Sequence, residues 1–383
     1  MDPFLSNKQQ EFRQQVRTFA EEEIKPVAKE LDEKSEFSES ITKKMFDMGL
    51  LRINLPEAYG GIGLDTLSYI IAVEELARVD GSQAATVAAH NSLGIAPIYN
   101  SGTEAQKQKF LPMLTTGKKL WAFGLTEPNA GSDSNNTETT AELKGGNWEI
   151  NGGKIYITNI SSAMSGGITV QAATGDKGNG IKELSVILVE KDTPGYSTEV
   201  IDSKMMWHAA DTGKVSFDKV LVPEENILGA RGKGAKIMLA TLDGGRLSIA
   251  AMGLGLAQGA FEMAMDYSGK RVQFGRPIRS FQINSFKLAD MATKIELART
   301  LLYKACWLKD NDQPFGKEAA MVKLYTSEIS REIANDSLQI HGAHGLMKDN
   351  PIERFYRDQR ILEVGEGTSE ILRLVISRHI GIR

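Results

Sequence analysis

The chain has 383 residues, of which 41% are hydrophobic and 25% are charged, with a formal net charge of −4 and an isoelectric point near 5.9. This length exceeds what one hydrophobic core usually serves, so it predicts roughly two or three domains. The weak negative charge, without a dense Lys or Arg run, argues against nucleic-acid binding. We expect no membrane partner, because no uninterrupted apolar run approaches the length that spans a bilayer.

The remaining bulk features concern compartment and metals. The single cysteine, Cys306, cannot form an intrachain disulfide, which fits a reducing compartment, and we expect it to be a small buried residue on a helix. The N-terminal stretch lacks the apolar core of a signal peptide and the Arg/Ser bias of a transit peptide, so we expect a cytoplasmic protein. His341 and His344 have helical spacing but no third ligand nearby in sequence, and we predict no metal site.

The first third of the chain has the hydrophobic spacing of helices. Apolar residues recur at three- and four-residue steps over residues 12–31, and a second helical pattern covers 66–79. A Pro- and Gly-rich break at 55–65 separates them, and 102–114 is a further amphipathic stretch. We therefore predict an N-terminal α-helical domain over residues 1–120.

Residues 121–233 have a different character. Short runs rich in Trp, Ile, Tyr, Thr and Val alternate with Gly, Asn, Asp and Pro, the pattern of strands and turns. These runs lie at 148–159, 167–174, 184–192 and 213–229. The pattern predicts a middle β domain that resembles a barrel.

Helical periodicity returns after residue 233 and predicts a C-terminal four-helix bundle over 234–383. The helical runs are 234–269, 279–310, 316–343 and 368–380. The expected fold class is therefore mainly α with a central β domain. The stretch "GLGLAQG" (253–259) follows a helical run rather than a strand, so we interpret its glycines as helix-packing residues and not as a dinucleotide-binding loop.

Two stretches in the β region combine turn formers, hydroxyls and an aromatic residue. The loop "FGLTEPNAGSD" (123–133) can present backbone N–H groups and hydroxyls to a flat polar ligand, or it can be a plain surface turn. In "KIYITN" (154–159), Tyr156 and Thr158 lie on one face of a strand. This pair suits an isoalloxazine ring and equally suits an ordinary hydrophobic strand.

Several stretches occur together in the order and spacing of the acyl-CoA dehydrogenases, a family that this chain resembles over essentially its whole length. They are "LPEAYGG", "VEELARVD", "LTEPNAGSD", "KIYITN", "LDGGR" (242–246), "KRVQFGRPI" (270–278), "QIHGAHG" (339–345) and "EGTSEI" (366–371). Each stretch is weak alone, and the set is specific. The resemblance implies a family fold with FAD held non-covalently between the β domain and the C-terminal helices.

The resemblance also implies site residues by position. Those matching flavin contacts are Phe123, Leu125, Thr126, Ser132, Tyr156, Thr158, Thr368 and Glu370, and those matching contacts to the adenosine diphosphate half, usually across a subunit interface, are Arg271, Gln273, Phe274, Gln282, Gln339, Gly342 and Ala343. Substrate-side positions are Ser132, Asp243, Arg246, Gly365, Gly367 and Arg378. The arginines among them have an alternative interpretation as solvated surface charge.

The reaction implied by the resemblance is α,β-dehydrogenation of an acyl-CoA thioester to the 2-enoyl-CoA. Glu366 matches the base that removes the α-proton while the β-hydride goes to flavin N5, and electrons then pass to an electron-transferring flavoprotein. Some family members carry the base at the position that Gly245 occupies here. Glycine has no side chain that could act as a base, so the sequence excludes that arrangement. Glu363 is expected to be a solvated or ion-paired charge, and Glu370 to lie in the first turn of the last helix.

Two departures from the family pattern bear on the details. Gly365 stands where a tyrosine often lines the acyl pocket, so either a branched or cyclic acyl group fits there or another side chain fills the space. Ala343 stands at a position that is commonly glycine. Other activities stay open: an acyl-CoA oxidase, an enoyl-CoA reductase or a non-catalytic CoA-binding relative. The resemblance suggests a homotetramer.

Overall fold

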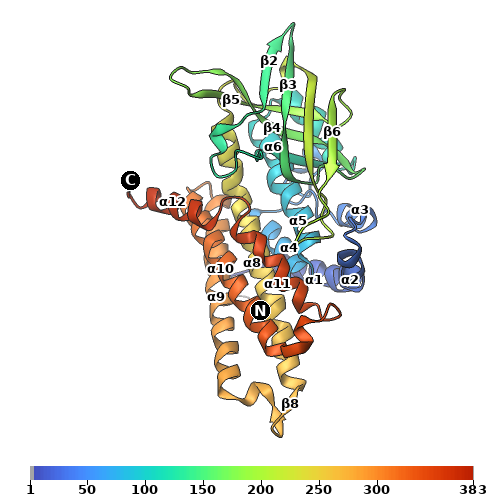
Figure 1. Ribbon diagram of the computed structural model, residues 1–383, viewed down its shortest axis with the longest axis vertical. Coiled ribbons are helices and arrows are strands. Elements are labelled where there is room, and N and C mark those ends of the chain that lie inside the picture. Colours follow the sequence, from blue (N-terminus) through green and yellow to red (C-terminus); the bar gives the residue numbers. More distant parts are fainter. Residues whose placement is uncertain (1–3, 383) are drawn as a thin grey trace.

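The computed structural model describes residues 4–382, so the outermost residues of the expected first and last domains, 1–3 and 383, lie outside the described part. A β domain lies at one end of a long helical body (Figure 1). The N-terminal helices flank the middle of this body, and the long C-terminal helices extend from the β domain to the opposite end.

Short helices make up the N-terminal domain. They are α1 (Asn7–Phe19), α2 (Lys25–Lys34), α3 (Glu39–Asp47), α4 (Thr66–Ala77), α5 (Gly81–Ala89), α6 (Ala96–Ser101) and α7 (Glu104–Leu114). Side chains start several of them: Ser6 caps α1 and Thr103 caps α7, each in a reciprocal capping box with a glutamine three residues on. Helix α4 is buried on nearly every face, which places it at the centre of the molecule.

Within the described residues, seven strands form one sheet. They are β1 (Leu120–Gly124), β2 (Thr140–Lys144), β3 (Asn147–Thr158), β4 (Ser165–Asp176), β5 (Lys182–Glu190), β6 (Tyr196–Val200) and β7 (Thr212–Pro223). Their order is β1-β4-β2-β3-β7-β6, and β5 pairs with β4. The antiparallel pairing of β3 with β7 shifts register between Lys154 and Ile157, so β3 bulges at Ile155 and Tyr156.

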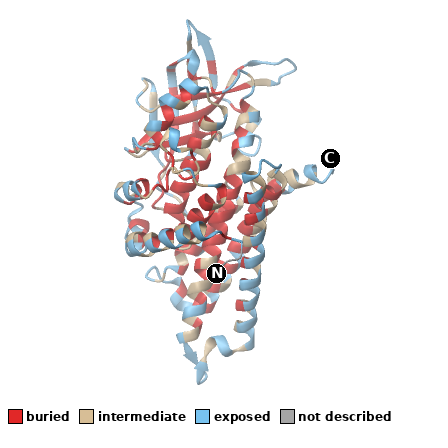
Figure 2. Ribbon diagram, turned by 180° about the vertical axis from the view of Figure 1, so that it is seen from behind, coloured by how far each residue is buried: buried red, intermediate tan, exposed pale blue. Residues whose placement is uncertain are grey.

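Long helices dominate the C-terminal domain. Its elements are α8 (Gly234–Lys270), the hairpin strands β8 (Val272–Gln273) and β9 (Arg276–Pro277), α9 (Gln282–Asp310), α10 (Gly316–His341), α11 (Ile352–Asp358) and α12 (Ser369–His379). Helix α8 packs on both α10 and α4 and so joins the two helical domains. Figure 2 shows the buried residues concentrated along this shared centre, whereas the hairpin end is exposed.

The glycines of 253–259 pack α8 against its neighbours, which confirms their interpretation from sequence. A methyl group on Gly255 would lie 2.3 Å from the backbone oxygen of Glu74, and one on Gly259 would lie 2.3 Å from that of Arg78. These contacts need bare backbone because α4 approaches α8 too closely for a side chain.

Helix α8 is also the one helix among residues 4–382 that is long and apolar enough to cross a membrane, with an 18-residue window of mean hydropathy 1.3. The sequence expectation considered only uninterrupted apolar runs and did not register this window. Since 72% of the window is buried inside the protein, its hydrophobicity is accounted for by packing in the core.

The expected fold class is confirmed: a helical N-terminal part, a central sheet and a helical C-terminal part follow one another along the chain. Cys306 is fully buried on α9, as expected. The short elements β1, β2, β6 and α11 were not predicted. Each spans five to seven residues, too few for a helical or strand period to stand out.

Candidate active site

Glu366 lies on a tight turn between two helical segments. A 3₁₀ segment (Gln359–Glu363) ends in the bond from Gly365 N–H to the oxygen of Ile361. Helix α12 starts at Ser369, after its N-cap Thr368, whose hydroxyl accepts a hydrogen bond from Ile371 N–H. Between them Glu366 has φ 52° and Gly367 has φ 99°. Glycine adopts this left-handed backbone freely, whereas Glu366 pays about 1 kcal/mol to do so. Backbone strain of this kind is common at functional sites.

The Glu366 carboxyl group points at bare backbone on α8. A methyl group on Gly245 would lie 2.0 Å from Glu366 Oε2 and 3.1 Å from Leu93 Cδ2. Glu366 as a residue is only half-buried, but Oε2 itself is shielded from solvent. Among residues 4–382 no group forms a hydrogen bond with Oε2. The carboxylate therefore keeps one shielded acceptor atom without a partner.

This burial changes the acidity of the Glu366 carboxyl group. Desolvation raises the pKa of Glu366 to about 7, because the charged form loses its hydration, and the positive charges of Lys323 and Arg246 oppose this rise. A carboxylate with a pKa near neutrality is a stronger base than one in water and still ionises at physiological pH.

Arg246 and Asp243 lie beside this group on α8. Arg246 is 5% exposed and its guanidinium donates to Asp243, so the alternative that it is a solvated surface charge is wrong. Burial raises the pKa of Asp243, while Arg246 and His379 act in the opposite direction. Arg378, by contrast, is exposed in the last turn of α12.

The β-domain residues gather around the bulge in β3. Ile155 N–H donates to the oxygen of Thr126 at 3.0 Å, which joins the loop after β1 to the strand segment with Tyr156 and Thr158. Tyr156 has φ 61° and is 67% exposed, an unusual backbone conformation for a bulky residue. The bulge thus turns an aromatic ring outward beside the hydroxyl-bearing loop. In the same region Phe123 is buried in β1, Leu125 is half-buried and Ser132 is exposed.

A buried ion pair that the sequence did not suggest supports this loop. Lys154 Nζ lies 2.6 Å from Glu127 Oε1 and also donates to the oxygen of Leu125 at 3.3 Å. Glu127 in turn accepts from the N–H groups of Glu138 and Thr139. This network fixes the loop that carries Leu125 and Thr126.

The residues expected at the adenosine end lie at the opposite end of the molecule from the β domain (Figure 1). The residues of this set on and beside the hairpin are all exposed: Arg271, Gln273, Phe274 and Gln282. Those in the last turn of α10 and just after it are exposed too: Gln339, Gly342 and Ala343. The ring of Tyr267 on α8 stacks on the ring of His341, with 4.5 Å between the ring centroids, and so joins the end of α8 to the end of α10. One chain therefore keeps the flavin-side residues of the β domain far from the adenosine-side residues of the hairpin.

The other two glutamates of the C-terminal motif have separate surroundings. Glu363 pairs with Arg331 and Arg360, which confirms the expectation of an ion-paired charge. Glu370 lies in the first turn of α12, as predicted, and hydrogen bonds to its own backbone N–H and to Thr368 lower its pKa. Glu366 alone of the three carries the raised pKa.

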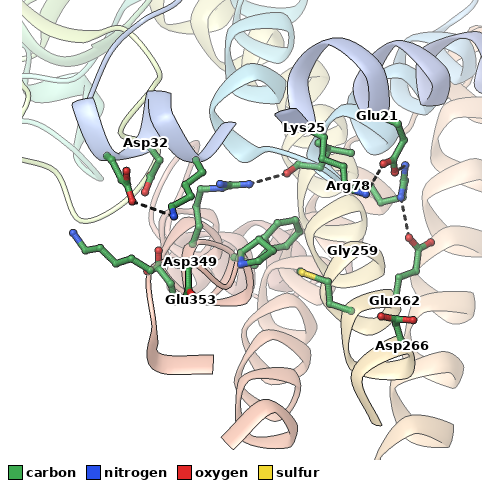
Figure 3. Close-up of a pocket in the computed structure, with 17 residues that line it drawn as sticks. Glu21, Lys25, Asp32, Arg78, Gly259, Glu262, Asp266, Asp349 and Glu353 are labelled. Carbon is green, nitrogen blue, oxygen red and sulfur yellow. Dashed lines mark hydrogen bonds and ion pairs between the residues drawn. The ribbon is translucent and has the colours of Figure 1, made fainter. Parts of the chain in front are cut away.

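A separate pocket of about 430 Å³ lies between α2, α8 and the start of α11 (Figure 3). Its walls carry charged side chains that bond to one another: Arg78 bonds to Glu21 and to Glu262. None of the candidate site residues lines it. Its walls are thus held by internal ion pairs, and it is distinct from the site around Glu366.

The sequence missed two residues that shape the site. Leu93, in the π-helical segment His90–Ile95, approaches the space beside Gly245. Lys323 on α10 is fully buried and near Glu366. The available signal was its place in a stripe of small residues at helical spacing: Ala319, Lys323, Ser327 and Ser330. A lysine in such a stripe must be buried, and buried lysines are rare.

Comparisons with known proteins identify the family of the chain. The chain matches the N-terminal, middle and C-terminal domains of acyl-CoA dehydrogenase over residues 6–118, 122–220 and 232–381. It is 47% identical over 376 residues to a probable acyl-CoA dehydrogenase of Bacillus subtilis, covering 98% of each chain. It is 43% identical over 384 residues to an acryloyl-CoA reductase (NADH) of Anaerotignum propionicum, covering 99% of this chain and 96% of that protein.

The structure of butyryl-CoA dehydrogenase from Megasphaera elsdenii is similar throughout, with a TM-score of 0.95, 41% identity, and coverage of 99% of this chain and 100% of that chain. The fold, the left-handed Glu366 turn and these similarities together define an oxidoreductase. The chain belongs to the acyl-CoA dehydrogenase family.

Proposed function

We propose that the protein catalyses FAD-dependent α,β-dehydrogenation of an acyl-CoA thioester to the 2-enoyl-CoA, with Glu366 as the base. The observation that carries this proposal is the buried, unpartnered Oε2 of Glu366, held against Gly245 with a pKa near 7. A structural glutamate would have a hydrogen-bond partner there, because an unsatisfied buried acceptor is costly.

In the proposed reaction Glu366 Oε2 takes the α-proton, and FAD, when bound, supplies the acceptor for the β-hydride. Negative charge then develops on the thioester carbonyl oxygen. The backbone N–H of Glu366 has no hydrogen-bond acceptor among residues 4–382 and is available to stabilise that charge. The same residue thus supplies the base and one hydrogen-bond donor.

The β-domain residues fit the flavin that the family implies. The ring of Tyr156 is exposed on a bulge next to Thr126, and Thr158 follows two residues later. A flat aromatic ligand would cover this ring, whereas an exposed tyrosine with a left-handed backbone has no evident structural purpose. Leu125, Thr126, Tyr156 and Thr158 are the residues that we propose to hold the flavin end.

The proposal requires a second copy of the chain. Residues of the hairpin and of 339–343 lie far from the flavin-side loop, so they serve the adenosine half only if they come from a neighbouring protomer (Figure 1). We therefore propose a homotetramer, with an electron-transferring flavoprotein as the electron acceptor. We also propose a cytoplasmic location and the domain boundaries 120/121 and 233/234 given by the sequence.

The acyl group is the open part of the substrate. A methyl group on Gly365 would meet the oxygen of Ile361 at 3.5 Å and its side chain at 3.7 Å, both ordinary contacts, so nothing in the local backbone demands glycine. The bare position leaves room beside the base, and we propose that a branched or cyclic acyl group uses it. The relative from Megasphaera elsdenii is a butyryl-CoA dehydrogenase, which makes butyryl-CoA the natural comparison.

A second candidate function is reduction of an enoyl-CoA by the same site in reverse. It is favoured by the 43% identity to an acryloyl-CoA reductase (NADH). An acyl-CoA oxidase or a non-catalytic CoA-binding protein would share the fold. Peroxide release would identify the oxidase, and purification without bound flavin would identify the binding protein.

The deciding experiment is an anaerobic titration of the purified flavoprotein with butyryl-, branched and cyclic acyl-CoAs, following the visible flavin band, for the parent and for Glu366→Gln. We expect bleaching by a branched or cyclic substrate in the parent and at least a ~10³-fold slower rate in Glu366→Gln, with bound flavin retained. Substantial turnover by Glu366→Gln would refute the base. A clear preference for butyryl-CoA would refute the bulky acyl group. Faster reduction of an enoyl-CoA by NADH than dehydrogenation of the acyl-CoA would favour the reductase.

A further inference from the structure

Lys323 is a fully buried lysine on α10 that the reaction described above does not use. Its Nζ donates to the backbone oxygen of Gly367 at 2.6 Å, directly after the candidate base. Moving an ammonium group into a protein interior is costly unless its charge and donors are engaged. This lysine has a defined partner in the turn of Glu366.

Ser327, one helical turn further along α10, bonds to the other end of the same segment. Its hydroxyl donates to the oxygen of Leu362 at 2.9 Å. The two side chains of α10 therefore hold the backbone at Leu362 and at Gly367, and the left-handed Glu366 lies between these two points. Ser327 carries no charge, so it shares the anchoring role of Lys323 but not its electrostatic effect.

The charged groups around Lys323 leave its charge to act mainly on Glu366. Those facing it are Glu366 itself, Arg246 from α8, Glu363 from the preceding 3₁₀ segment and Glu370 from α12. Glu363 is neutralised by Arg331 and Arg360, and Arg246 by Asp243. Among residues 4–382 Lys323 has no ion pair within 4.0 Å, so it acts on Glu366 through space rather than by direct contact.

Lys323 remains charged in the pH range in which Glu366 ionises. Burial lowers its pKa to about 8, and the nearby Glu366 carboxylate opposes that change. Near pH 7 the ammonium group is therefore present while Glu366 ionises. A positive charge close to a carboxyl group favours the carboxylate and so limits how far burial weakens its acidity.

We propose that Lys323 is a positioning residue for the base: it fixes the Glu366–Gly367 turn through the Gly367 oxygen and, by its charge, favours the ionised form of Glu366. The proposal rests on Glu366 being the base. It assigns to α10 a role in acid–base tuning that differs from holding the cofactor or the substrate.

The test compares Lys323→Met, Lys323→Arg and Ser327→Ala in the flavin-loaded enzyme, with kcat/KM for the best acyl-CoA measured between about pH 5.5 and 9. The acidic limb of this profile reports the pKa of the base in the free enzyme. Methionine keeps the length of the side chain without charge, arginine keeps the charge, and Ser327→Ala removes the neutral anchor. Flavin content and the thermal midpoint of each variant are recorded alongside.

Removing the charge should raise the pKa of Glu366. We therefore expect the acidic limb in Lys323→Met to move to higher pH by about one unit. The variant's kcat/KM should then be ~10-fold below that of the parent at pH 6, and the difference should become small above pH 8. Lys323→Arg should restore the position of the limb, even if its maximum is lower. Ser327→Ala should lower the maximum or the thermal midpoint and leave the limb in place.

An unchanged limb in folded, flavin-loaded Lys323→Met would overturn the proposal, and so would an equal shift in Ser327→Ala. If Lys323→Met does not fold, Lys323→Gln takes its place, because it keeps a donor without the charge. If neither folds while Ser327→Ala does, Lys323 serves folding and the proposal is wrong. Retained turnover in Glu366→Gln would instead refute the proposed function, so the two failures are distinguishable.

Discussion

Glu366 combines a left-handed backbone, a shielded oxygen and a raised pKa, each of which disfavours the folded state. Such a residue persists only where its surroundings determine its conformation. The surroundings here are α8, which offers bare backbone at Gly245, and α10, which holds the turn at Gly367. The strain is therefore confined to one residue and supported from two helices.

The raised pKa predicts a pH-dependent stability. Between about pH 4.5 and 7 the folded protein holds a proton on Glu366 that the unfolded chain releases, so this group lowers the free energy of unfolding as pH rises through that range. The full penalty is present above pH 7. We expect Glu366→Gln to be more stable than the parent by about 2 kcal/mol at pH 8 and similar to it at pH 4.

Urea unfolding of the flavin-free proteins at both pH values measures this difference. Glu142→Gln, on the exposed β2, is the matched control, and we expect little change at either pH because its side chain is 71% exposed. A stability difference for Glu366→Gln that is the same at pH 4 and pH 8 would contradict the prediction.

At this scale the sequence singled out Glu366 as the candidate base but did not indicate its surroundings. The motif "EGTSEI" singled out Glu366, and glycine at 245 excluded the other position. The contact between Gly245 and Glu366, about 120 residues apart in the chain, depends on how α8 crosses the C-terminal turn. No local pattern encodes such a crossing. Lys323 was missed because helical periodicity treats a lysine as a polar face by default.

Helix α8 is the element on which the site depends. It carries Asp243, Gly245 and Arg246 beside Glu366 and, about three turns later, the glycines that pack on α4. Because both regions belong to one helix, their spacing along α8 fixes the position of the Glu366 turn relative to α4. A change in the packing of α8 therefore affects both stability and the position of the base.

We predict that Gly255→Ala destabilises the protein by about 1–3 kcal/mol, because its methyl group would meet the backbone oxygen of Glu74 at 2.3 Å. Gly244→Ala on the same helix is the control: its methyl group would meet only Lys309 Nζ, at 3.7 Å, and alanine favours helices. Denaturant unfolding of both variants makes the comparison. Equal stability of Gly255→Ala and the parent would mean that α4 can move away from α8.

The sequence predicted the helices in which the hydrophobic periodicity extends over several turns. It did not predict the short helices and strands. The long helices α8, α9 and α10 were predicted within a few residues of their ends, whereas β1, with five buried residues, has no alternation to detect. The bulge at Tyr156 also escaped prediction, since it arises from the register of β3 against β7. Register is set by the partner strand and not by the strand alone.

On the scale of the whole molecule, the candidate cofactor residues of the β domain and those of the hairpin lie far apart in one chain. The hairpin carries Phe274, which is 93% exposed, at the tip beyond α8 and α9. Val272 on the hairpin and Ile283 and Phe286 at the start of α9 are exposed as well, and a group of exposed apolar residues is typical of a surface that a partner covers. The proposed assembly supplies that cover.

We predict that Phe274→Asn leaves the protomer folded but reduces self-association and retention of FAD. Phe274 has φ 51°, a conformation that asparagine tolerates well, so the hairpin itself should persist. Light scattering after size-exclusion chromatography gives the oligomeric state, and the ratio of flavin to protein absorbance gives cofactor retention. Ile181→Asn, at 60% exposure in the β4–β5 turn, is the control. An intact, fully loaded oligomer of Phe274→Asn would contradict the prediction.

The contact between Gly245 and Glu366 also restricts how such an enzyme can change over evolution. The tip of the Glu366 side chain occupies the space that the first carbon of any side chain at 245 would need. A lineage that transfers the base from the C-terminal turn to α8 therefore cannot gain the new glutamate while the old one keeps its place. A stepwise change must pass through a form with an emptied or displaced base, and only a change of both positions together avoids that intermediate.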